Sequence, residues 1–113
     1  MVEREAMERG RAIFDPIAER ECALPGVDIG RMFGTEGLRI RTKVYAFVVH
    51  KGSLVVKLSE ERVGDLTAAG DARPMVMRNR PMREWAEVPI EAGSDRWTAL
   101  IAEARGFVDE ITP

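Results

Sequence analysis

The residues with reactive side chains are few, and their spacing limits the chemistry open to the chain. Cys22 and His50 are the sequence's single cysteine and single histidine, and a thiol beside an imidazole is the arrangement that nucleophilic catalysis uses. Cys22 ends a helical run just before Leu24-Pro25, whereas His50 lies in the turn of an expected hairpin. Such a cysteine usually packs as a small apolar group, and a histidine in a turn is usually solvated. We therefore expect no catalytic pair.

Metal, phosphate and acid-base chemistry are disfavoured as well. One histidine and one cysteine cannot form a zinc site within one chain, and no calcium-loop spacing of acids occurs. The glycines between residues 26 and 37 precede strands and not a helix, so we interpret them as turn residues at strand ends. Glu84 and Glu87 lie three apart on an expected strand and would point to opposite faces. The sequence predicts a protein that is not an enzyme and has no metal or cofactor.

Composition indicates a soluble globular protein. The 113 residues are 45% hydrophobic and 32% charged, which predicts a single domain over residues 1–113 with one core. A net charge of −2 is unlike that of a general nucleic-acid binder. No apolar run is long enough for a membrane helix, and the charged start MVEREAMERGR does not resemble a signal peptide. One cysteine fits a reducing compartment, so we expect a cytoplasmic protein without membrane contact.

Helices are expected at both ends of the chain. Residues 3–23 have a helical pattern, but Asp15-Pro16 resembles a cap and first turn, so we expect a new helix there and residues 1–14 as a helical or loosely ordered lead-in. Ser94 is the expected cap of the last helix. The apolar residues expected to face the core are Ile13, Phe14, Ile17, Ala18, Trp97, Leu100, Ile101, Ala104, Phe107, Val108 and Ile111.

Short strands fill the middle of the chain. They are expected over residues 28–33, 37–42, 44–49, 53–58, 74–77 and 82–88. A loop at 50–52 predicts a hairpin, Ser59 and Gly70 are expected to bound a short helix, and a turn is expected at 79–81. Because the strands are grouped and do not alternate with helices, the expected class is α+β with an antiparallel sheet, a short helix after the central hairpin, and a helix at each end.

One strand is apolar at every position. The segment VYAFVV, residues 44–49, predicts burial on both faces of the sheet. If the helices all cover one face, an apolar strip remains on the other and needs a cover. Two alternatives remain for what covers the strip: other segments of the same chain, or a second subunit in a homodimer. The strip would consist of Tyr45, Phe47, Val49 and Val55.

Charge is unevenly distributed along the chain. Residues 31–57 and 73–83 are rich in Lys and Arg, whereas residues 84–113 hold seven acids against two arginines. Alternation along 37–42 and 82–88 places basic side chains beside an aromatic ring if the two strands share a face. That surface suits an acidic protein partner or single-stranded nucleic acid. The alternative is that Trp85 packs in a core while the arginines pair with acidic helices. The candidate binding residues are Arg39, Arg41, Lys57, Arg78, Arg80, Arg83 and Trp85.

The order of several short motifs resembles the TfoX/Sxy N-terminal domain family. Met32-Phe33-Gly34 enters the sheet, LVVKL ends a hairpin, GDARP follows, and RPMREW precedes the last helix. The resemblance covers about residues 15–110, and the MmcQ/YjbR-like group is a related alternative. It implies a curved antiparallel sheet with helices at either end and a bacterial protein in transcriptional regulation, with no catalytic residues to transfer to this sequence.

Three functional hypotheses follow from these observations. The first is a non-enzymatic, stand-alone TfoX N-terminal-like module that contacts an unknown protein partner, with a homodimer as one form. The second is a nucleic-acid-associated accessory protein that uses the same basic face, which strong salt dependence would reveal. The third is a small-ligand-binding protein or an enzyme, which would require a concave pocket.

Overall fold

The computed structural model describes residues 3–32 and 35–113, which form an antiparallel sheet with helices beside it. Within these residues the sheet has six strands in the order β1-β2-β3-β4-β6-β5, and it is open and curled. The α+β class and the curved antiparallel sheet are confirmed. The elements are α1 (Glu3–Cys22), β1 (Val27–Met32), β2 (Thr35–Ile40), β3 (Lys43–Val48), β4 (Leu54–Lys57), α2 (Glu60–Ala68), β5 (Arg73–Met77), β6 (Arg80–Val88), η1 (Ile90–Ala92) and α3 (Ser94–Ile111).

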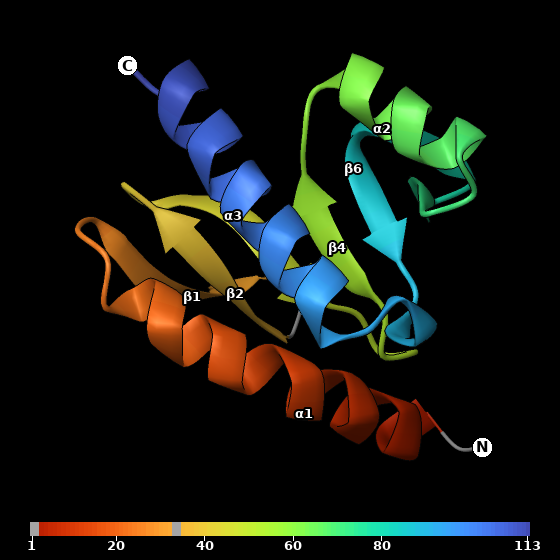
Figure 1. Cartoon of the computed structure of the whole chain (residues 1–113), viewed down its shortest axis with the longest axis horizontal. Coiled ribbons are helices and arrows are strands. Elements are labelled where there is room, and N and C mark those ends of the chain that lie inside the picture. The colour runs from red at the N-terminus through yellow and green to blue at the C-terminus, as the bar shows by residue number, and fades with distance from the viewer. Residues whose placement is uncertain (1–2, 33–34) are drawn as a thin grey trace.

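The described helices cover one face of the sheet, and the core lies between the two layers (Figure 1). α3 packs on β3 and β4, α1 packs on β1 and β3, and α2 packs on β5 and β6. No described helix combines the length and the apolar composition that crossing a bilayer requires. Phe33 and Gly34 of the Met-Phe-Gly motif lie outside the described residues. The core residues contributed by the helices are Phe14, Ile17, Ala18, Val63, Leu66, Trp97, Leu100, Ile101, Ala104 and Val108.

α1 is one helix of 20 residues, so the predicted break at Asp15-Pro16 is wrong. Proline lacks the N–H that would bond to the Ala12 carbonyl, but Ala12 and Pro16 are both exposed, so water can reach that carbonyl. Arg11 and Asp15 form an ion pair at 2.9 Å across one turn of the helix. On the side of the helix opposite Pro16, Phe14 anchors the helix in the core at 2% exposure. Tertiary burial therefore overrides the local break signal.

Close backbone contact joins α1 to the central hairpin. The predicted loop at residues 50–52 connects β3 and β4, and Gly52 has a φ of 88°. A Cβ on Gly10 would lie 2.3 Å from the Gly52 carbonyl oxygen, so two glycines allow the helix and the turn to touch. The loop therefore sets where α1 crosses the sheet.

The predicted helix boundaries are partly confirmed. The Ser59 hydroxyl accepts a hydrogen bond from the Arg62 N–H at the start of α2, and Gly70 follows its end with a φ of 79°. Ser94, however, is the first residue of α3 and not its cap. Gly93 holds the cap position with a φ of 88° and no side-chain cap bond, because glycine can turn the chain directly from η1 into α3.

Two further predictions need correction. The turn between β5 and β6 is Arg78-Asn79, with φ values of 53° and 63°, so Arg80 already belongs to β6. A two-residue turn of this kind matches the twist of a hairpin. Ile111 is 52% exposed and does not join the core, because the last turn of α3 borders a hollow beside the end of the sheet.

A bulge in β3 changes the predicted apolar strip. Leu38 pairs with Ala46 whereas Arg39 pairs with Val44, so Tyr45 is an extra residue. The bulge places Tyr45 with Ala46 in the core on the helix side. Phe47 and Val55 are buried at 2% and 0% exposure and Val49 is half-buried. The strip is covered within the same chain and offers little apolar surface to a second subunit.

The Tyr45 hydroxyl joins a buried polar network. It donates to Glu21 Oε1 at 2.8 Å, and the Arg105 guanidinium donates to Glu21 Oε2. Three elements, β3, α1 and α3, therefore meet at the one carboxylate of Glu21. Burial and the Glu21 carboxylate both raise the pKa of the Tyr45 phenol, so the hydroxyl remains a donor.

Replacement of Tyr45 by Phe tests this network. The variant keeps the ring and removes one of the two donors to a buried carboxylate, so we expect it to lower the free energy of unfolding by about 1–2 kcal/mol. Thr98→Ala, which removes a hydroxyl bond on one helix, is the control and should change it by less than about 0.5 kcal/mol. Urea denaturation measures both. Equal midpoints for Tyr45→Phe and the unmodified protein would show that the hydroxyl contributes nothing.

Candidate functional site

Trp85 lies half-buried on the sheet face opposite the helices. It is the register partner of Lys57 between β4 and β6, and the Lys57 ammonium lies 5.0 Å from the centroid of the indole ring. Phe47 meets the indole edge-on, with ring centroids 5.7 Å apart and an interplanar angle of 62°. Since Phe47 is buried, Trp85 helps to cover the apolar base of this face and keeps part of its own surface in solvent. Trp85 therefore packs and also remains accessible.

Two shallow hollows share Trp85 and Lys57 as lining residues. One has a volume of about 460 Å³ and lies toward the start of β6 and α2. The other has a volume of about 350 Å³ and lies toward the end of α3. The first is lined by Lys57, Glu60, Pro81, Met82, Arg83, Glu84 and Trp85, and the second by Lys43, Val44, Lys57, Trp85, Val108, Ile111, Thr112 and Pro113.

Of the predicted binding residues, Lys57, Arg83 and Trp85 come together around the first hollow. The cationic groups of Lys57 and Arg83 each have an acidic partner at a long hydrogen-bond distance. Lys57 Nζ lies 3.4 Å from Glu84 Oε1, and Arg83 Nη1 lies 3.4 Å from Glu60 Oε1. The Arg83 side chain is 75% exposed, and exposed pairs of this length contribute little to stability. An anionic partner can therefore displace them at small cost.

Arg39 is neutralised by an acid on the neighbouring strand. Its guanidinium binds the Asp28 carboxylate through two hydrogen bonds of 2.9 and 2.6 Å, which lower the pKa of Asp28. The guanidinium lies over Gly30, where a Cβ would approach it to 2.5 Å. Gly30 pairs with Gly37 inside the β1–β2 ladder. These two glycines are therefore not turn residues, as the sequence predicted. Gly30 makes room for Arg39, whereas a Cβ on Gly37 would lie 3.1 Å from the Ala46 carbonyl oxygen of β3.

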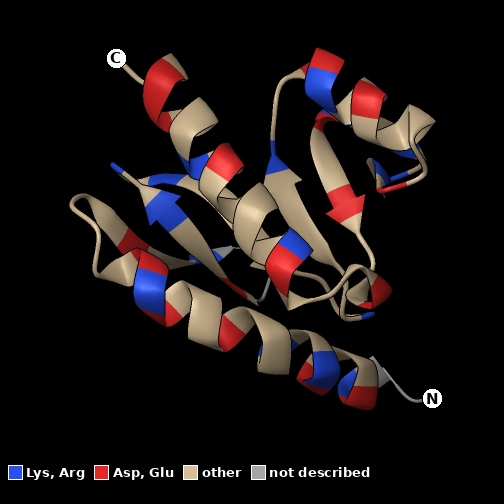
Figure 2. Ribbon diagram, in the orientation of Figure 1, with Lys and Arg blue, Asp and Glu red and all other residues tan. Residues whose placement is uncertain are grey.

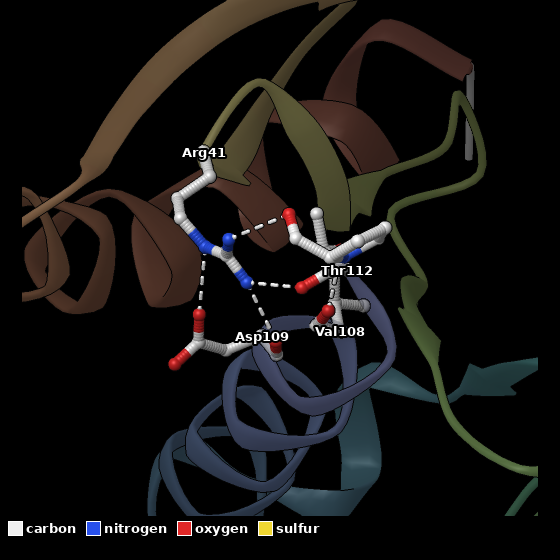
Figure 3. A network of polar contacts seen from close by, with 5 residues as sticks. Arg41, Val108, Asp109 and Thr112 are labelled. Atoms are coloured by element: carbon white, nitrogen blue, oxygen red, sulfur yellow. Dashed lines mark hydrogen bonds and ion pairs between the residues drawn. The ribbon is translucent and has the colours of Figure 1, made fainter.

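Arg41 does not share a face with Arg39, contrary to the prediction. β2 ends at Ile40, and Arg41 turns toward the C-terminal end of α3 (Figure 3). Its guanidinium donates to the Asp109 carboxylate at 2.9 Å and to the Asp109 and Thr112 carbonyls at 2.7 and 2.6 Å. It also bonds the Pro113 carbonyl oxygen at 3.1 Å. Arg41 thus satisfies carbonyls that the helix end leaves unpaired, and it places a cation at the negative end of the helix dipole.

Arg78 and Arg80 lie at the tip of the β5–β6 hairpin. Both are exposed, and within the described part of the chain neither has an ion-pair partner. Val76 beside them is 61% exposed. The described helices and β6 also carry acidic residues (Figure 2). The other cations of the predicted surface each have an acidic partner, namely Arg39, Arg41, Lys57 and Arg83. Among the residues that the structure describes, the tip is the part of that surface where the cations have no acidic partner.

Glu87 forms a polar site that the sequence did not reveal. Its carboxylate is 7% exposed and accepts from Lys51 Nζ at 2.9 Å and from Arg73 Nη2 at 3.2 Å. Burial raises the pKa of Glu87, but the hydrogen bonds from Lys51 and Arg73 outweigh it, so the pKa is lowered. Arg73 and Glu87 are register partners between β5 and β6, and Lys51 comes from the turn between β3 and β4. No spacing in the sequence indicates that these three residues meet.

Reactive groups do not converge in the described chain. α1 touches the hairpin turn near Gly10, whereas Cys22 lies twelve residues further on, about 18 Å along the helix axis, so it is out of reach of His50. Burial, Asp28 and Glu21 all raise the pKa of the Cys22 thiol, which disfavours the thiolate. Among residues 3–32 and 35–113 no group of three or more His, Cys, Asp or Glu side chains is placed to hold a metal ion.

No protein-family model matches the chain, and no curated protein is detectably similar to it.

Paired glycine variants test the Arg41 contact. Arg41 and Thr42 have φ values of 47° and 72°, a conformation that glycine adopts without strain. Thr42→Gly should raise the free energy of unfolding by about 0.5–1 kcal/mol. Arg41→Gly relieves the same strain but removes the bonds to α3, so we expect a net loss of about 1–2 kcal/mol.

Thermal denaturation and amide hydrogen exchange measure the two effects. Arg41→Gly should also speed exchange in the last turn of α3, whereas Thr42→Gly should leave that turn unchanged. Similar stabilisation by both glycines would mean that the Arg41 guanidinium does not hold the helix end.

The Glu87 site predicts a dependence of stability on pH. The folded pKa of Glu87 is lowered, so its contribution is present above the unfolded value and is lost as pH falls through the folded value. Glu87→Gln should lower stability at pH 7 by about 1–2 kcal/mol and flatten the fall in stability toward acid pH. Glu84→Gln, at an exposed position, is the control and should do neither. Parallel stability curves for Glu87→Gln and the unmodified protein would contradict the assignment.

Proposed function

We propose that the chain is a non-enzymatic, TfoX N-terminal-like interaction module of the cytoplasm, and that it binds an acidic protein partner through the β5–β6 hairpin. The observation that carries the proposal is the charge of Arg78 and Arg80, which have no ion-pair partner among the described residues, beside the exposed Val76. Arginine next to an apolar side chain is typical of protein-binding surfaces. A non-catalytic role is supported by the separation of Cys22 from His50 and by the occupation of the Glu87 carboxylate by two cations.

The edge of the sheet adds a second recognition element. β5 is an edge strand paired with β6, and no described backbone hydrogen bond outside that ladder reaches residues 73–77. Outward-facing backbone groups of an edge strand accept an added strand from a partner. Pro74 removes one donor near the start of the strand. The free edge is therefore centred on Met75 to Met77, next to the arginine tip.

Charge supports an acidic partner over a second copy of the same strand. Antiparallel pairing of two β5 edges would bring Arg73 of each chain near Arg78 and Arg80 of the other, and like charges across a strand pair are destabilising. The methionines at 75, 77 and 82 are half-buried, and their flexible side chains adapt to different apolar groups. An extended segment with acidic and apolar residues is complementary to this surface.

Site-specific photo-crosslinking in cells tests the proposal. A photoreactive residue at Val76 should give a discrete protein adduct, and the same residue at Ala12, an exposed position on α1, should not. The double variant Arg78→Glu, Arg80→Glu should abolish the Val76 adduct. Its matched control is Arg4→Glu, Arg20→Glu, which changes two exposed arginines of α1 and should retain the adduct.

Light scattering on size-exclusion chromatography distinguishes the proposed protein binding from the alternative of nucleic-acid binding. A mixed-sequence single-stranded DNA, applied at low and moderate salt, should leave the elution of the protein unchanged. Binding that weakens steeply with salt and is lost in the Arg78→Glu, Arg80→Glu variant would overturn the proposal in favour of phosphate recognition. Equal adducts from Val76 and Ala12 would also contradict it.

A further inference from the structure

The hollow between Trp85 and the end of α3 has the build of a small-ligand site. Its volume of about 350 Å³ falls at the lower end of the range typical for ligand pockets. Val44 and Trp85 contribute apolar surface from the sheet, and Val108 and Ile111 contribute it from α3. Because Ile111 is 52% exposed although it follows the helical spacing of the core residues, this wall has apolar surface that nothing in the described chain covers.

The ionisable side chains that line the hollow are those of Lys43 and Lys57, and no Asp or Glu side chain is among the described lining residues. Lys43 is exposed, and among the described residues it has no ion-pair partner. Lys57 lies over the Trp85 ring, and its carboxylate neighbour Glu84 is 3.4 Å away on the side of the other hollow. Two ammonium groups therefore flank an apolar base.

The C-terminal end of a helix carries partial negative charge, which opposes the binding of an anion. Here Arg41 offsets that charge, since its guanidinium bonds the carbonyls of Asp109, Thr112 and Pro113 (Figure 3). The same bonds hold Thr112 and Pro113 in place as part of the lining. A wall that is already ordered reduces the entropy cost of binding.

We infer that this hollow binds a small amphipathic anion, a carboxylate attached to one aromatic ring or to a medium-length acyl chain. The apolar part lies against Val44, Trp85 and Ile111, and the carboxylate meets the ammonium groups of Lys43 and Lys57. A neutral ligand gains nothing from the lysines, and a cationic ligand is repelled by them. The site is distinct from the hairpin tip, so the inference does not depend on the proposed protein partner.

Nuclear magnetic resonance titration of the whole chain tests the inference. Phenylacetate and octanoate are the anionic probes, phenylacetamide and octanamide the neutral controls, and phenethylamine the cationic control. We expect the anions to bind with a Kd of about 1 mM or tighter, and to shift the signals of Val44, Ile111 and the Trp85 indole. The amides should bind roughly tenfold more weakly, since they lose the charge-assisted contacts, and the amine should not bind.

Variants locate the site. Lys43→Met, at an exposed position, should weaken phenylacetate binding about three- to tenfold, and Ile111→Asp should abolish it. Arg20→Met, which removes an exposed positive charge from α1, and the hairpin variant Arg78→Glu, Arg80→Glu should leave the Kd unchanged. Amides that bind as tightly as the acids, shifts outside the hollow, or no shift at about 10 mM anion would overturn the inference. If the hairpin variant still binds the anion, the small-ligand site is shown to be independent of the hairpin. The inference can then hold even if the proposed protein binding fails its own test.

Discussion

One extra residue in β3 decides which side chains each face of the sheet presents. Without the bulge, Tyr45 would alternate onto the open face with Phe47. With it, Tyr45 turns to the helices and its hydroxyl meets Glu21, which also receives Arg105 from α3. A buried carboxylate requires such donors, because an unpaired charge in the core is costly. The bulge therefore fixes the positions of α1 and α3 on the sheet.

The same bulge shapes the open face. Val44 and Phe47 lie on this side at either end of the irregularity, and the Trp85 ring packs against Phe47 in a T-shaped arrangement. Because Phe47 and Val55 are buried within the chain, this face presents a half-buried tryptophan and the hollows beside it, not a broad apolar strip. That geometry is typical of recognition of a small group or a side chain, and it provides little area for a large apolar interface.

Pairing of charges separates structural cations from available ones. Arg39 and Arg41 each form several hydrogen bonds. Arg39 joins β2 to β1 through Asp28, and Arg41 holds the end of α3 in place. Lys51 and Arg73 are held by the buried Glu87. Arg78, Arg80 and Lys43 have no such role in the described chain. Availability for a partner thus depends on tertiary neighbours and not on how many cations a segment contains.

The sequence by itself determined the elements and their class. Apolar periodicity located α3, a glycine loop located the central hairpin, and Ser59 marked the start of α2, because these signals act through local backbone chemistry. The resemblance to the TfoX N-terminal family rests on motif order and stays a prediction. Three of the proposed binding residues, Lys57, Arg83 and Trp85, line one hollow in the structure, and their role in binding stays a prediction.

Tertiary structure decided the rest, because those outcomes depend on contacts between distant residues. Burial of Phe14 and Ile17 keeps α1 continuous through Pro16, whose local signal predicted a break. The register shift at Tyr45, the turn of Arg41 toward α3 and the convergence of Lys51, Arg73 and Glu87 each join segments far apart in the chain. Local patterns specify which way a side chain alternates, but only packing fixes the register, and a shift of one residue moves a side chain to the opposite face.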